Sequence, residues 1–143
     1  MMTEMDVSQP VLQTIVAGMH AMAMADGTLD PREKALLDAV MVDIDGEPEL
    51  NFSVLDTEET KELFMTMVTS VALADAEIDP SEYALLEKYA QLLSVPNSAM
   101  QYIALVAEEM FSQYSLEERQ VLVPKLAEKL YLDADFVAKM TSV

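Results

Sequence analysis

The sequence of 143 residues contains no cysteine and no tryptophan, and it has only three glycines and one histidine. Without cysteine the chain cannot form a disulfide, a thiolate metal site or a cysteine nucleophile. A zinc site with one histidine and no cysteine would be unusual, so His20 is predicted to be a partly buried packing residue. The scarcity of glycine and the apolar content of 52% indicate a compact, mostly helical chain.

Basic residues are also scarce, since eight lysines and arginines face 26 aspartates and glutamates, which gives a formal charge of −18. Residues 1–60 hold thirteen acids, with Arg32 and Lys34 as their only bases. Phosphate backbones and anionic lipid surfaces would repel such a chain, so nucleic acid is not expected as a partner. Cations and basic protein segments are the partners that the charge favours.

No stretch of the sequence is apolar enough to suggest a membrane span. The longest apolar run, residues 11–25, is short and is interrupted by Gln13, Thr14, Gly18 and His20. The first six residues are acidic and lack the basic start of a secretory signal. These features predict a buried helix at residues 11–25, no membrane insertion and a cytoplasmic location.

The chain contains an internal repeat. The nonapeptide ADGTLDPRE at residues 25–33 returns as ADAEIDPSE at residues 74–82, which is 49 residues later. Residues 23–37 and 72–86 are identical at nine of fifteen positions, and each copy lies between an apolar segment and an Ala-Leu-Leu run. A period of this size indicates a duplicated helical hairpin.

Apolar spacing and helix-capping signals predict one all-α domain over residues 1–143, a compact bundle of about seven helices. The first hairpin is expected at about 10–45, the second at about 57–94, and the C-terminal helices at about 96–142. Gly18 is expected to let neighbouring helices approach the first helix closely. Asp56 is predicted to cap the third helix and Pro96 to open the fifth. Pro124 is expected to kink or split the sixth helix, because proline removes a backbone donor.

The acidic residues of the repeat are the candidate site. Carboxylates that converge on a loop are the ligands that hard divalent cations prefer. The spacing is not that of an EF-hand, because counting from Asp26 puts Leu37 where the bidentate glutamate belongs. Helix capping is the alternative, since Asp-Pro-x-Glu has the form of a capping box. The candidate cation ligands are Asp26, Asp30, Glu33, Asp75, Glu77, Asp79 and Glu82.

No pattern typical of catalysis is present. The sequence lacks a Ser/His/Asp order, a glycine-rich phosphate loop and an H-E-x-x-H motif. Paired carboxylates can hydrolyse glycosidic bonds, but nothing in the sequence indicates a sugar cleft. The protein is therefore predicted not to be an enzyme.

The repeat resembles the TerB-like family, which includes tellurite-resistance TerB proteins and the N-terminal domain of membrane-anchored DnaJ-like co-chaperones. The resemblance covers residues 12–95 and rests on the Ala-Asp-Gly loop at 25–27, with Glu33 and two leucines downstream. The second copy departs from the pattern because it has Ala76 in place of glycine. The family's acids map onto Asp26, Glu33, Asp75 and Glu82. The resemblance implies an all-helical domain with an acidic, metal-binding surface and a role in stress response, without an established reaction.

Two functional hypotheses follow. In the first, the protein is a non-enzymatic TerB-like module that binds a divalent cation or a protein partner through its acidic loops. In the second, it is a protein-interaction scaffold without metal, and the acids only cap helices. The co-chaperone role does not transfer, because the sequence has no J-domain and no transmembrane segment.

Overall fold

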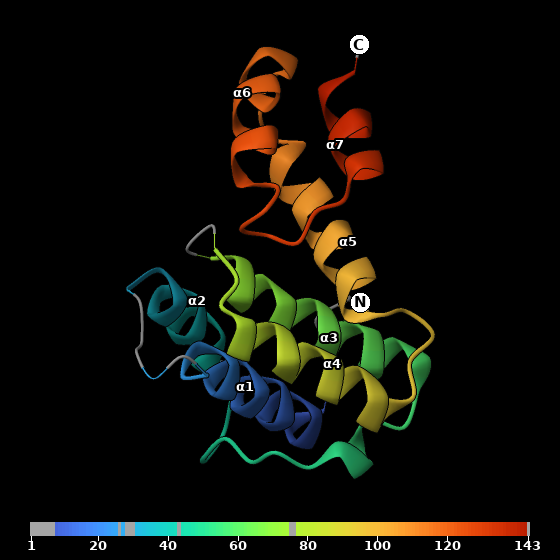
Figure 1. Ribbon diagram of the computed structural model, residues 1–143. Helices are drawn as coiled ribbons and strands as arrows, with labels where there is room; N and C mark the ends of the chain where they lie inside the picture. The colour runs from blue at the N-terminus through green and yellow to red at the C-terminus, as the bar shows by residue number, and fades with distance from the viewer. Residues whose placement is uncertain (1–7, 26, 28–30, 43, 75–76, 143) are drawn as a thin grey trace, which may run out of the picture.

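The computed structural model describes residues 8–25, 27, 31–42, 44–74 and 77–142, and within these ranges every regular element is helical (Figure 1). The elements in chain order are α1 (Gln9–Ala23), α2 (Pro31–Met41), the 3-10 helix η1 (Phe52–Val54), α3 (Glu58–Leu73), α4 (Pro80–Leu93), α5 (Ala99–Phe111), α6 (Leu116–Leu126) and α7 (Ala134–Thr141). The predicted all-α class with about seven helices is confirmed. The equivalence of the two hairpins stays a prediction. None of the described helices has the length and apolar character needed to cross a bilayer.

Helix α3 contacts α1, α2, α4 and α5, and α1 packs along it (Figure 1). Residues Val16, Met19 and Met22 of α1 are fully buried, as expected for a helix that is apolar around most of its circumference. Gly18 faces α3, and a Cβ atom at this position would lie 2.5 Å from the ring of Phe64. The close approach of the two helices therefore depends on the missing side chain, which confirms the expected role of Gly18.

The connector between α2 and α3 is held against α1 by hydrogen bonds. The Asp45 amide donates to Gln9 Oε1 over 2.7 Å. The buried hydroxyl of Thr14 donates to the Glu49 carbonyl over 3.0 Å. These bonds fix the path of the backbone, while the carboxylates of Asp45 and Glu49 remain exposed.

An aromatic cluster joins the connector to the helices. Phe52 of η1 lies edge-on to Phe64 of α3 and to Tyr89 of α4, with ring centroids 5.4 Å apart in both pairs. Phe64 and Tyr89 are also edge-on, at 5.2 Å. Such pairs stabilise a core beyond the area that they bury. The ring of Phe64 is therefore held on several sides.

Helix α3 begins one residue later than predicted. Thr57, not Asp56, is the N-cap, and its Oγ1 accepts from the Thr60 amide over 3.1 Å. Thr60 Oγ1 in turn accepts from the Thr57 amide over 3.2 Å. Two overlapping capping patterns, Asp-x-x-Glu from 56 and Thr-x-x-Thr from 57, compete here, and the chain uses the second.

Helix α5 begins at Ala99, so the prediction that Pro96 opens it was wrong. Ser98 is the N-cap, and its Oγ accepts from the Gln101 amide over 3.2 Å. Gln101 Oε1 accepts from the Ser98 amide over 2.7 Å, which completes a capping box. Pro96 lies in the loop before the helix because these two reciprocal bonds fix the start of α5 later in the chain.

The structure also tests the predictions made for His20 and for Pro124. His20 is exposed on α1, so the prediction that it is partly buried was wrong. Helix α6 continues through Pro124 to Leu126, so it is not split at the proline. Pro124 lies close to the C-terminal end of the helix, where the helix stops two residues later.

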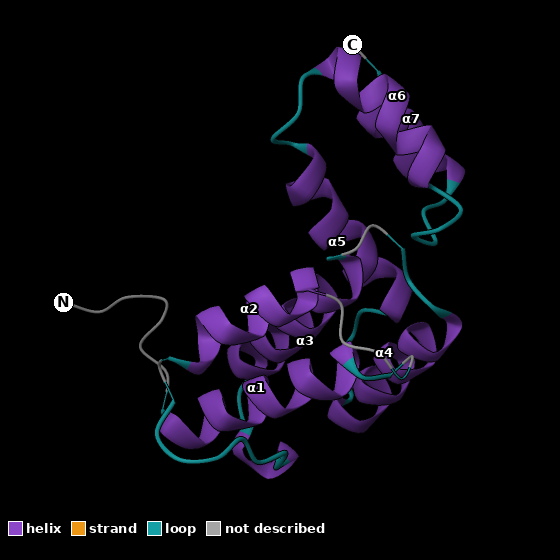
Figure 2. Ribbon diagram, turned by 90° about the vertical axis from the view of Figure 1, so that its left-hand side faces the viewer, coloured by secondary structure: helices purple, strands orange, loops and turns teal. Residues whose placement is uncertain are grey.

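Helices α6 and α7 lie side by side at the far end of α5 (Figure 2). Arg119 Nε donates to the Met140 carbonyl over 2.9 Å, and Gln120 Nε2 donates to the Thr141 carbonyl over 3.2 Å. The apolar residues that this pair buries with the end of α5 are Phe111, Val123, Leu130, Phe136 and Met140. We refer to α6, α7 and the residues between them as the C-terminal pair.

The loop before α4 joins the C-terminal pair to the rest of the bundle. Ile78 is buried, and its amide donates to the Lys129 carbonyl over 3.0 Å. The rings of Tyr83 and Tyr131 stack with their centroids 4.4 Å apart. Tyr131 has a φ of 58°, a left-handed conformation that side chains rarely adopt. Stacking of the two rings therefore stabilises a turn in which the backbone conformation of Tyr131 is unfavourable by itself.

Helix α5 places the buried side chain of Tyr102 against the first half of α3. Its hydroxyl has no hydrogen-bond partner of good geometry among the described residues, although Glu62 and Asn97 are near enough to act on it electrostatically. Burial raises the pKa of the Tyr102 hydroxyl above its ordinary range, and the carboxylate of Glu62 raises this pKa further. The folded protein therefore keeps the phenol proton at a pH at which the unfolded chain releases it.

This difference predicts a loss of stability in alkaline solution. Above about pH 10 the unfolded chain binds fewer protons than the folded one, so the free energy of unfolding falls as the pH rises. The slope from one such group is at most about 1.4 kcal/mol per pH unit. Urea unfolding between about pH 8 and 11 should show a shallower decline for Tyr102→Phe than for the wild type. Burial also raises the pKa of Tyr89, so part of the decline should remain, and equal slopes would contradict the assignment to Tyr102.

Candidate interaction site

The structure places the predicted repeat acids in different environments. Asp26, Asp30 and Asp75 lie outside the described residues. Glu33 and Glu82, which correspond in the two copies, occupy the third positions of α2 and α4, and each is only 2% exposed. Their carboxylates lie inside the protein, so they are not available to a ligand at the surface.

The second repeat copy forms the predicted capping box. Asp79 is the N-cap of α4, and its Oδ1 accepts from the Ser81 amide over 2.9 Å and from Ser81 Oγ over 2.6 Å. Glu82 Oε1 accepts from the Asp79 amide over 2.8 Å. The hydrogen bonds from the side chain and then the amide of Ser81 lower the pKa of Asp79. Both carboxylates therefore satisfy backbone donors at the start of α4.

Glu77 lies at a hollow of about 420 Å³ that the repeat loop shares with the C-terminal pair. Glu128, Lys125 and Lys129 also line this hollow. The two ammonium groups add positive charge where a cation site would need negative charge. Among the described residues, no group of three or more acidic or histidine side chains is placed to hold a metal ion.

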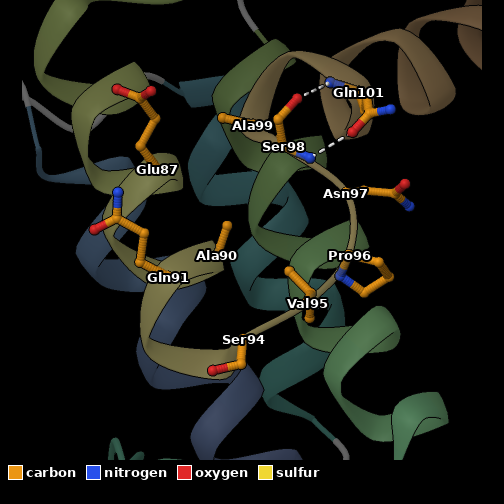
Figure 3. A pocket seen from close by; sticks show the side chains of 10 residues that line it. All are labelled: Glu87, Ala90, Gln91, Ser94, Val95, Pro96, Asn97, Ser98, Ala99 and Gln101. Carbon is orange, nitrogen blue, oxygen red and sulfur yellow. Dashed lines mark hydrogen bonds between the residues drawn. The ribbon is translucent and has the colours of Figure 1, made fainter.

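A second hollow, of about 330 Å³, lies between the end of α4 and the start of α5 (Figure 3). Figure 3 shows a mixed lining of apolar and polar side chains, in which Glu87 is the one ionisable residue among those described. Ser98 and Gln101 are bonded to each other in the α5 capping box, as the dashed lines mark. Two of its polar side chains are therefore already used at the start of α5.

The most apolar of these three hollows lies where α2, α3 and α5 meet, and it has a volume of about 390 Å³. We call it the α3–α5 groove. Its apolar lining residues are Leu36, Leu73, Ala74, Val106 and Met110. Among the described residues that line the groove, Glu109 is the only ionisable one, and none is basic. A volume and a lining of this kind are typical of a site that accepts apolar side chains of a ligand.

The groove belongs to the strongly acidic part of the chain. Residues 1–114 hold 21 of the 26 acids but only four of the eight bases. Residues 115–143 are close to neutral by the same count. A positively charged ligand is therefore attracted to the body that carries the groove rather than to the C-terminal pair.

The chain was compared with protein-family models, with curated proteins and with solved structures, and none of them matches it. The resemblance to the TerB-like family thus stays a prediction from the repeat motif.

Proposed function

We propose that the protein is a non-enzymatic interaction module that binds a basic segment of another protein, while its repeat acids serve as helix caps. The observation that carries this proposal is the excess of 21 acids over four bases in residues 1–114. Most of the described acidic side chains are exposed, so their field reaches a partner in solution. A role in tellurite resistance or stress response is part of the proposal only through the resemblance.

The geometry supports this hypothesis over cation binding in the repeat loops. Glu33 and Glu82 are buried, and Asp79 accepts hydrogen bonds from Ser81 at the start of α4. Glu77 has Lys125 and Lys129 as neighbours in its hollow. Asp79 and Glu82 thus bond the start of α4, Glu77 has basic neighbours, and helix capping accounts for the Asp-Pro-x-Glu pattern in the second copy.

A peptide titration tests the proposal. The probe is a fluorescent peptide of about 18 lysines and leucines, with leucine at i, i+3, i+4 and i+7, which we call the Lys–Leu peptide. We expect it to bind at low ionic strength and to weaken by about tenfold or more as salt rises from about 0.05 to 0.3 M. The matched control has glutamate in place of every lysine and should not bind. Fluorescence anisotropy measures both affinities.

Two outcomes would contradict the proposal. Absence of Lys–Leu binding, or equal binding of the glutamate control, would remove the electrostatic basis for a basic partner. A melting temperature raised by several degrees by one of Ca²⁺, Mg²⁺, Mn²⁺ or Zn²⁺ would support cation binding if the rise were lost in Asp26→Asn with Asp75→Asn. Small equal shifts with every ion are expected, because all of them screen the charge of −18.

A further inference from the structure

We infer that the α3–α5 groove is the docking site for one amphipathic, basic helix of the partner, and this inference rests on the proposed function. Leu73 of α3 is buried, while Leu36 of α2 and Met110 of α5 are only partly covered. Helices α2 and α5 therefore present apolar surface that the chain itself does not fully bury. A partner that buries it gains the free energy of removing apolar area from water.

The shape of the surface favours a helix as the occupant. The structure has no strand within its described ranges, so an extended segment would find no sheet edge to pair with. A groove between helices instead accepts apolar side chains spaced at i, i+3, i+4 and i+7. Exposed Thr66 and Gln113 line the same groove and supply polar groups beside its apolar floor.

The negative charge of the protein favours a positively charged partner and argues against a second copy of this chain. Glu109 lines the groove, and none of the described lining residues is basic, so none of them would repel a lysine or arginine. Two copies would each bring a charge of −18, so their approach is opposed by repulsion. A basic helix with one apolar face satisfies both the charge and the apolar lining.

A matched pair of methionine variants tests the site. Met110→Gln places an amide in the groove, and Met100→Gln makes the same change on α5 outside the groove, where Met100 is 40% exposed. We expect Met110→Gln to weaken binding of the Lys–Leu peptide by about tenfold and Met100→Gln to leave it within about twofold. Equal affinities for the two variants would overturn the inference.

A second pair of variants tests the site even if Met110→Gln fails to fold. Gln113→Arg adds a positive charge at the exposed edge of the groove, and Gln91→Arg adds the same charge at an exposed position of α4 outside it. The first variant should weaken binding by about tenfold more than the second, because it both obstructs the groove and repels the peptide. Circular dichroism of each variant verifies that its helices are retained.

Methyl NMR locates the peptide directly. With ¹³C-methyl methionine, the Lys–Leu peptide should shift the Met110 signal and leave that of Met100 in place. A scrambled Lys–Leu peptide, with equal charge but no apolar face, should bind at least about tenfold more weakly. If the scrambled and ordered peptides bind equally with the same salt dependence, the groove assignment fails while the proposed function stands. If neither binds, both fail, and a doubled mass in light scattering would assign the groove to a second copy.

Discussion

Replacing Gly18 with alanine is expected to destabilise the protein by about 1–3 kcal/mol, although alanine is the better helix former. The added Cβ would lie 2.5 Å from the Phe64 ring, which is fully buried. The ring cannot move aside easily, because Phe52 and Tyr89 lie against it with centroids 5.4 and 5.2 Å away. Urea unfolding monitored by circular dichroism measures the loss.

A double variant separates the clash from other effects of alanine. Phe64→Leu alone should destabilise the protein, because it leaves space among the rings. Combined with Gly18→Ala, it should recover part of the loss, so the two changes together should cost less than their sum. An increase in stability for Gly18→Ala alone would show that helix propensity outweighs the contact with Phe64.

Replacing Glu82 with alanine is expected to lower the free energy of unfolding by about 1–3 kcal/mol. The change removes the oxygen that accepts from the Asp79 amide over 2.8 Å and leaves a cavity at a position that is 2% exposed. Water cannot readily replace an acceptor there, so the amide loses its partner. Thermal and urea unfolding of Glu82→Ala measure the change.

Glu118→Ala is the matched control for Glu82→Ala. Glu118 Oε1 accepts from the Ser115 amide over 2.9 Å in the same type of capping box, but Glu118 is exposed. Water can take its place, so the loss should be about 0.5 kcal/mol or less. Glu82→Gln retains an acceptor and should stay closer to the wild type. Equal losses for Glu82→Ala and Glu118→Ala would show that burial adds nothing.

Much of the helical architecture could be predicted from local sequence, because capping patterns and apolar spacing are short-range signals. Asp79 with Glu82 and Ser115 with Glu118 are reciprocal pairs three residues apart, and both begin helices as expected. The start of α3 was predicted one residue early because two capping patterns overlap there. A local rule cannot choose between them when both satisfy backbone donors.

The candidate site was less predictable, because it depends on how helices cross. The Asp-Pro-x-Glu pattern fits both a cap and a cation ligand, and in the second copy the burial of Glu82 and its hydrogen bond from the Asp79 amide distinguish them. The α3–α5 groove joins Leu36, Leu73 and Met110, which are distant in sequence. One signal was present, namely Val106 and Met110 four residues apart beside Glu109, but it does not reveal that α3 leaves them partly uncovered.

The way in which the C-terminal pair is attached implies that it opens before the central helices when the native protein fluctuates. Its tie to the loop before α4 consists of the Ile78–Lys129 hydrogen bond and the stack of Tyr83 on Tyr131. The turn at Tyr131 is already disfavoured by its left-handed backbone, so breaking the stack releases strain as well as contact. The pair can therefore separate from the loop before α4 while α1 and α3 stay packed. Its amide protons would then exchange with solvent before those of the central helices.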